Sequence, residues 1–120
     1  MALTVLVVDD DPLIVDFLEM ALEDEGYQVL ATVGGDAIPL ARDHQPSVIL
    51  LDINMPGMDG IEVSRRLRDD PATARIPIII MSAQDRLRAT GPLMPVDDRL
   101  PKPFELSVLY QKVARWARAS

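Results

Sequence analysis

The stretch LTVLVVDDD, residues 3 to 11, decides the fold class of this 120-residue chain. Its first six residues form an apolar run rich in Val, which is typical of a strand buried on both faces of a parallel sheet. The run ends abruptly in three aspartates, and Pro12 then suits the first turn of a helix. Apolar residues recur at helical spacing until Gly26, so this part of the chain predicts one strand followed by one helix.

The same pattern of strand and helix recurs along the whole chain, and it predicts an α/β fold with helices on both faces of one parallel sheet. Four more strands are expected at residues 27 to 32, 47 to 51, 76 to 81 and around 99 to 100, and helices at 36 to 44, after 60 and from 106. Asp36 is expected to cap the second helix. Because Gly91, Pro92 and Pro95 interrupt the segment between the last two strands, the fourth helix is expected to be short or distorted.

The length, composition and charge of the chain limit the classes of protein to which it can belong. A chain of 120 residues with 48% hydrophobic and 26% charged residues predicts one globular domain, residues 1 to 120. The net charge of −7 disfavours binding to nucleic acid, since that affinity comes from Lys and Arg. No apolar run is long enough for a membrane span and no signal peptide is recognisable, so we expect a cytoplasmic protein without a membrane partner. The absence of Cys excludes disulfides and thiolate metal sites.

Polar residues follow four of the five predicted strands. They are Asp9 and Asp10, Asp52, Ser82 and Lys102. Because the carboxyl ends of parallel strands share one edge of the sheet, and ligands bind in the crevice there, we expect these side chains to converge.

Three carboxylates at close range repel one another unless a cation lies among them. Oxygen ligands without His or Cys favour Mg²⁺ or Mn²⁺, and Mg²⁺ commonly combines one or two carboxylates with waters and a phosphate. A carboxylate can also attack phosphorus to give an aspartyl phosphate. In such a site Lys102 supplies positive charge to the phosphoryl oxygens, and the Ser82 hydroxyl donates a hydrogen bond to them. The pattern therefore indicates phosphoryl transfer.

Over nearly its full length the chain resembles a response-regulator receiver domain of two-component signalling, of the single-domain chemotaxis type. The resemblance is carried by four ordered blocks, which are Val7-Val8-Asp9-Asp10, Leu50-Leu51-Asp52 with Met55-Pro56-Gly57-Met58-Asp59-Gly60, Met81-Ser82-Ala83, and Lys102-Pro103-Phe104. It implies a flavodoxin-like (βα)5 fold with a doubly wound five-stranded sheet in the order 2-1-3-4-5.

The resemblance also implies roles for single residues. Asp52 would be the phosphoacceptor, and Asp9, Asp10, Asp52 and the backbone carbonyl of Asn54 would hold Mg²⁺ or Mn²⁺. Ser82 would follow the phosphoryl group as a switch, Lys102 would pair with it, and Lys102-Pro103 would be a cis peptide. The implied partners are a histidine kinase or histidine phosphotransfer protein and a downstream protein target, with the chain a monomer or weak dimer.

Two departures from the family pattern affect the expected output. Arg99 stands three residues before Lys102, where receivers usually carry an aromatic residue that swings inward. The segment from Ser82 to Lys102 is also about two residues shorter than the corresponding segment in most receiver domains. We therefore expect output or dimerisation to avoid the usual fourth-helix face.

Simpler roles and other functions stay open at this point. Asp11 is interpreted as a helix cap, His44 as a surface residue, Trp116 as a packing residue and Asp69-Asp70 as a helix exit. The protein is expected to be a phosphoacceptor that promotes its own phosphorylation and dephosphorylation, not a turnover enzyme. A degenerate receiver that only binds partners is the alternative. A haloacid-dehalogenase type hydrolase is disfavoured because Asn54 stands where it needs a second acid, and a dinucleotide or flavin site lacks its Gly-rich loop.

Overall fold

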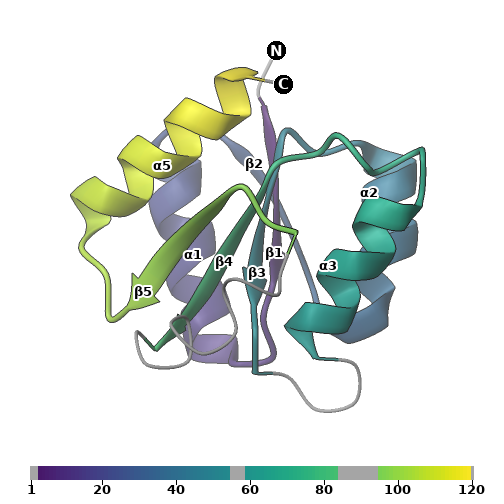
Figure 1. The fold of residues 1–120 in the computed structure, drawn as a ribbon. Coiled ribbons are helices and arrows are strands. Elements are labelled where there is room, and N and C mark those ends of the chain that lie inside the picture. Colours follow the sequence, from purple (N-terminus) through teal and green to yellow (C-terminus); the bar gives the residue numbers. More distant parts are fainter. Residues whose placement is uncertain (1–2, 55–58, 84–94, 120) are drawn as a thin grey trace.

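The computed structural model describes residues 3–54, 59–83 and 95–119 (Figure 1). The expected fourth helix and the loop residues Met55 and Met58 lie outside these ranges. Of the described helices, none is both long and apolar enough to cross a membrane.

The secondary structure follows the predicted alternation, with boundaries that differ by one or two residues. The strands are β1 (Thr4–Val8), β2 (Gln28–Thr32), β3 (Val48–Asp52), β4 (Ile78–Ala83) and β5 (Asp98–Lys102). The helices are α1 (Pro12–Asp24), the 3-10 turn η1 (Gly34–Asp36), α2 (Ala37–His44), α3 (Gly60–Asp69) and α5 (Leu106–Ala119).

The five strands form one parallel sheet in the order β2-β1-β3-β4-β5, which confirms the predicted order. Helices α1 and α5 cover one face of the sheet, and α2 and α3 cover the other (Figure 1). All strands run toward the same edge. The order reverses between β1 and β3, so a crevice at the carboxyl ends of these two strands is the expected ligand position.

Side chains of successive strand residues point alternately into two apolar clusters. Val5 and Val7 of β1 pack with Leu18 and Leu22 of α1 on one face. Leu6 and Val8 pack with α2 and α3 on the other. Because β1, β3 and β4 are buried on both faces, their positions are fixed by packing on either side, and the polar residues at their ends are held on a rigid base.

Helix ends show which capping predictions were right. The Asp11 side chain accepts a hydrogen bond from the N–H of Leu13 at 3.0 Å, which confirms it as the cap of α1. Asp36 was expected to cap α2, and this is wrong. Asp36 has helical backbone angles and makes no capping hydrogen bond, because the turn η1 precedes α2 and already brings the chain into a helical path. As predicted, α3 ends at Asp69.

A carboxylate joins β5 to α5 at the end of the sheet away from the crevice. Asp98 accepts hydrogen bonds from Lys112 Nζ at 2.7 Å, Trp116 Nε1 at 2.8 Å and the N–H of Arg99 at 2.8 Å. Burial, the largest single effect, acts to raise the pKa of Asp98, but these three donors together hold it below the ordinary 3.8. Trp116 is therefore more than a packing residue, because it also fixes α5 to β5.

We expect Asp98→Asn to lower the free energy of unfolding by about 1 to 2 kcal/mol at neutral pH, because hydrogen bonds to a charged acceptor are lost. A lowered folded-state pKa gives stability that is present above the unfolded pKa and disappears as the pH falls through the folded value. The difference between wild type and variant should thus vanish in strong acid. Urea denaturation followed by Trp116 fluorescence measures it, with Asp43→Asn, an exposed acid on α2, as the control. A pH-independent difference would contradict this account.

Candidate metal centre

The predicted site residues lie together at the carboxyl edge of the sheet. Asp9 and Asp10 follow β1 directly, Asp52 is the last residue of β3, and Lys102 is the last residue of β5. Ser82 is the residue before the end of β4 and is paired in register with Pro101 of β5. Four strands therefore bring these five residues to the same edge of the sheet.

Three of these residues form a carboxylate cluster. Asp9, Asp10 and Asp52 each offer an oxygen, and these oxygens lie within 4.8 Å of one another. Asp9 and Asp52 are buried, with 0% and 7% of their side chains exposed, whereas Asp10 is exposed. The cluster thus opens to solvent on the side of Asp10, and a cation could reach it there.

Lys102 lies against the buried part of the cluster. Its Nζ is 3.1 Å from Asp9 Oδ2 and 3.5 Å from Asp52 Oδ1. The second oxygen of Asp9, Oδ1, accepts a hydrogen bond from the N–H of Asp11 at 2.9 Å. One positive charge therefore serves two buried carboxylates, and the cluster keeps an excess of negative charge.

The excess of negative charge affects the pKa of Asp52. Burial raises the pKa of the Asp52 carboxyl above its ordinary value, and the negative charge of Asp9 adds to the effect. Lys102 and the backbone N–H of Asn54 act in the opposite direction but do not cancel it. The charged form of Asp52 is thus under-stabilised by the protein alone, as expected for a site that awaits a further cation.

A buried hydroxyl is a second sign that this edge of the sheet can accommodate a ligand. Ser82 is 1% exposed, and its Oγ has no hydrogen-bond partner among the described residues. Leaving a buried hydroxyl unpaired costs about 1 to 3 kcal/mol, so such groups are rare without a reason. Because Ser82 stands at the same edge as the carboxylates, an oxygen-bearing ligand at this edge would satisfy it.

Gly60 packs directly against the backbone of Asp52 and Ile53. A Cβ atom at this position would lie 2.4 Å from the Asp52 carbonyl oxygen and 2.7 Å from Ile53 Cα, so only glycine fits. Gly60 also donates its N–H to the Ile53 carbonyl at 2.9 Å. Asp59 caps the same helix end by accepting from the N–H of Glu62 at 3.0 Å. The start of α3 therefore presses directly on the residue that ends β3.

The structure also bears on predictions made for single residues outside the carboxylate cluster. The Lys102-Pro103 peptide is cis, as the resemblance implied. His44 is exposed at the end of α2, and Arg99 is exposed on β5. The metal-ligand role of the Asn54 carbonyl stays a prediction, since the contact observed at Asn54 is its N–H toward Asp52.

The sequence did not predict the close contact between Gly60 and Asp52. A capping pattern was nevertheless present at the same helix end, because Asp59 is followed three residues later by Glu62.

The donor set fits a hard divalent cation. Three carboxylate oxygens from two strand ends, without His or Cys, are the ligand type of Mg²⁺ and Mn²⁺. The unpaired Ser82 hydroxyl could then contact an anion beside that cation, and Lys102 could turn to the same anion once the cation shares the charge of Asp9 and Asp52. Cation and anion together would neutralise the site.

Comparison with known protein families identifies a family for this chain. The pattern of the response regulator receiver domain matches residues 5–114. The protein PilH of Pseudomonas aeruginosa is 38% identical over an alignment of 112 positions, which covers 91% of this chain and 93% of PilH. The response regulator PleD of Caulobacter vibrioides is 39% identical over an alignment of 121 positions, which covers 98% of this chain but 27% of PleD.

Solved structures agree with this match. The receiver domain of the sensor histidine kinase PA1611 from Pseudomonas aeruginosa superposes with a TM-score of 0.91 at 28% identity, over 98% of this chain and 99% of that one. Its structure has a magnesium ion coordinated in the active site cleft. The chemotaxis protein CheY4 of Vibrio cholerae superposes with a TM-score of 0.87 at 28% identity, over 97% of this chain and 99% of CheY4.

Proposed function

Because this chain belongs to the response regulator receiver family of two-component signalling, we propose that it accepts a phosphoryl group on Asp52 from a phosphohistidine of a partner protein. The observation that carries the proposal is the meeting of Asp9, Asp10 and Asp52 within 4.8 Å, with Lys102 against two of them. The phosphorylated and unphosphorylated forms would then differ in their affinity for a downstream protein.

The transfer balances without a further reactant. An oxygen of the ionised Asp52 carboxylate attacks phosphorus, a P–O bond forms and the P–N bond to the donor histidine breaks. The electron pair of that bond stays on the imidazole nitrogen, which then takes a proton. The products are an aspartyl phosphate and a neutral histidine, so the protein acts as an acceptor and not as a turnover enzyme.

Three residues of the chain would assist this step. Gly60 and the β3 ladder hold the backbone of Asp52, so that its carboxylate is positioned before the donor arrives. Lys102, released from Asp52 as negative charge moves onto the phosphoryl group, would pair with that group, and the Ser82 Oγ would donate its unused hydrogen bond to a phosphoryl oxygen.

A divalent cation is the proposed cofactor. Asp9, Asp10 and Asp52 would hold it, with the Asn54 carbonyl as the further ligand that the family resemblance implies. When bound, Mg²⁺ or Mn²⁺ neutralises the charge that builds up on the transferring phosphoryl oxygens.

Intact-mass measurement tests the proposal. With acetyl phosphate and Mg²⁺, the chain should gain the mass of one phosphoryl group, and hydroxylamine should remove it because an acyl phosphate is attacked at carbon. A chelator in place of Mg²⁺ should suppress the gain by about a hundredfold or more in rate, since the charge of the phosphoryl oxygens is then unopposed. Equal labelling with and without the chelator would contradict the role of the cation, and no labelling by any donor would favour a phosphorylation-independent interaction module.

A further inference from the structure

Strand β5 carries Lys102 to the site, but the packing of β5 fixes its position only weakly. It lies at the edge of the sheet, beside β4. Of its five residues only Leu100 is buried, whereas all five residues of β3 are buried. Pro101 also has no N–H to donate to the sheet. Because the register of a strand is specified mainly by the apolar side chains that it buries, β5 needs a further contact that fixes its position along β4.

The register of β5 on β4 decides how two groups of the site lie relative to each other. Ser82 of β4 is paired with Pro101, and Ala83 is paired with Lys102. A shift of β5 by one residue would move Lys102 by about 3.3 Å and turn its side chain to the other face of the sheet. The Ser82 hydroxyl and the Lys102 ammonium would then no longer reach the same anion.

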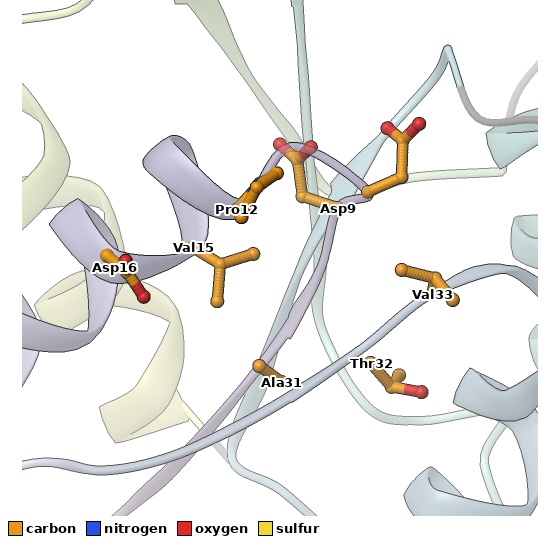
Figure 2. Close-up of a pocket in the computed structure, with 8 residues that line it drawn as sticks. Asp9, Pro12, Val15, Asp16, Ala31, Thr32 and Val33 are labelled. Carbon is orange, nitrogen blue, oxygen red and sulfur yellow. The ribbon is translucent and has the colours of Figure 1, made fainter.

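The carboxylate cluster is open on the side away from these two strands. A hollow of about 280 Å³ lies between the start of α1 and the end of β2, and Asp9 forms part of its wall. Figure 2 shows Val15 of α1 and Thr32 of β2 lining this hollow. Ser82 and Lys102 do not line it, because β4 and β5 lie on the other side of β1 and β3. The positions of these two side chains therefore depend on β4 and β5.

Asp97 joins the start of β5 to the start of β4. Its N–H donates to the Ile78 carbonyl at 2.9 Å, and its Oδ2 accepts a hydrogen bond from the N–H of Ile78 at 2.8 Å. Asp97 therefore binds both backbone groups of the first residue of β4. A change of register would break both hydrogen bonds, because both join the same two residues.

Arg68, in the last turn of α3, holds the Asp97 side chain in this position. Its guanidinium pairs with Asp97 Oδ2 and donates to the Pro95 carbonyl at 2.8 Å. It also donates to the carbonyls of Ala74 at 3.0 Å and Ile76 at 2.7 Å. Only 20% of the Arg68 side chain is exposed. One planar set of donors thus connects α3 to the segment before β4 and to the segment before β5.

The neighbouring Asp98 makes a different attachment. Its hydrogen bonds with Lys112 and Trp116 join β5 to α5 and determine which face of β5 turns toward that helix. The contacts of Asp97 instead join β5 to β4, the strand that carries Ser82. The position of β5 along β4 is therefore assigned to Asp97.

We propose that Asp97 and Arg68 are positioning residues of the phosphoryl-transfer site, which set from the far end of β5 the register that places Lys102 beside Ser82. This rests on the proposed function, in which Lys102 and Ser82 both contact the phosphoryl group. Asp97 and Arg68 do not touch the reacting atoms, and the bonds that form and break are those given above. A misplacement of about 1 Å can lower a rate about a hundredfold, so even a partial loss of register is measurable.

A double-mutant cycle with Lys102→Met separates positioning from plain stabilisation. Asp97 and Lys102 are about 16 Å apart along an extended strand, and sites at such a distance normally act independently within about twofold. Asp97→Ala should slow labelling by acetyl phosphate and Mg²⁺ about tenfold in the wild type, but less than about twofold in Lys102→Met. Asp97→Asn keeps an acceptor for the Ile78 N–H and should slow labelling by less than about threefold. Intact mass over time gives all the rates.

Urea denaturation in chelator repeats the cycle without phosphoryl transfer. Lys102 pairs with Asp9 in the present register of β5. The factor by which Lys102→Met lowers the folding equilibrium constant should therefore be smaller, by about threefold or more, in the Asp97→Ala background than in the wild type. If the wild type were not labelled by any donor, the proposed function would fail, and this second cycle would still decide whether Asp97 positions Lys102.

Two arginines supply a matched control. Arg68→Met should behave like Asp97→Ala in both cycles. Arg42→Met removes a guanidinium that pairs with Asp70, away from β5, and it should leave the labelling rate unchanged and act independently of Lys102→Met. Should Arg68→Met fail to fold, Asp97→Ala carries the test, because its backbone hydrogen bond to Ile78 remains.

Three results would overturn the inference. The first is that Asp97→Ala and Lys102→Met act independently in either cycle, since Asp97 would then serve stability alone. The second is that Asp97→Asn slows labelling as much as Asp97→Ala, since the hydrogen bond to Ile78 would then not set the register. The third is that Arg42→Met is coupled to Lys102→Met as strongly as Arg68→Met is, since the coupling would then be unspecific.

Discussion

Asp52→Asn is expected to abolish the phosphoryl mass gain completely. Asn has nearly the shape of Asp but carries no negative charge and no nucleophilic oxygen, so neither the attack on phosphorus nor the third metal ligand remains. Asp52 is also the buried acid that ends β3 and that Gly60 holds in place, whereas both oxygens of Asp9 already accept hydrogen bonds, from Lys102 at 3.1 Å and from the N–H of Asp11 at 2.9 Å. Labelling is therefore expected at one residue only.

The fold of this variant should be intact, which makes the loss interpretable. Because the pKa of Asp52 is raised in the folded protein, its charged form lowers the free energy of unfolding at every pH above that value, and the penalty is absent below the unfolded pKa. Asn removes the penalty, so the variant should melt at or above the wild-type temperature in chelator at neutral pH. Asp36→Asn, an exposed acid without a capping role, is the control and should label like wild type. Undiminished labelling of Asp52→Asn would refute the assignment.

Lys102→Met is expected to lower the free energy of unfolding by about 3 kcal/mol when a chelator is present. This value is at the low end of the range for breaking a buried ion pair, because the Lys102 side chain is partly exposed. Methionine keeps the length of the side chain but removes the cation that pairs with Asp9, the only such cation among the described residues, and the Asp9 side chain is fully buried. Mg²⁺ should restore most of this loss, since a ligand that binds only the folded state adds about 2.7 kcal/mol at a hundred times its Kd. Urea denaturation followed by circular dichroism, with chelator and with Mg²⁺, measures both effects.

The chain has one other lysine, and it supplies the control. Lys112 pairs with Asp98 at 2.7 Å, at the opposite end of β5 from the carboxylate cluster. Lys112→Met should be destabilised to a similar extent with and without Mg²⁺. If Mg²⁺ stabilised the two variants equally, or if Lys102→Met were as stable as wild type in chelator, the ammonium of Lys102 would not be the counter-ion of the cluster.

The architecture could be predicted from sequence because its signals are local and repeated. Apolar runs such as Leu3 to Val8 can be stable only when buried on both faces, and parallel strands then bring their carboxyl ends to one edge. The convergence of Asp9, Asp10, Asp52, Ser82 and Lys102 follows from that topology alone. The strand order came from the family resemblance, and the structure confirms it.

Details that depend on exact backbone paths could not be predicted. Whether Asp36 caps α2 depends on the turn that precedes the helix, and the residue type Asp gave the wrong answer. The contact of Gly60 with Asp52 joins residues eight apart across a loop, and the attachment of Asp98 to Trp116 joins a strand to a helix. Such contacts are set by tertiary packing, for which neither periodicity nor propensity carries information.

The contact of Gly60 with the Asp52 backbone affects which residues selection keeps as sequences diverge. The glycine is required by the backbone of Asp52, not by its carboxylate, so a descendant that lost the aspartate would still be under selection to keep the glycine. In a collection of diverged sequences, glycine at this place would therefore mark those that keep the shape of the fold. The acidic residues alone would mark those that keep the chemistry.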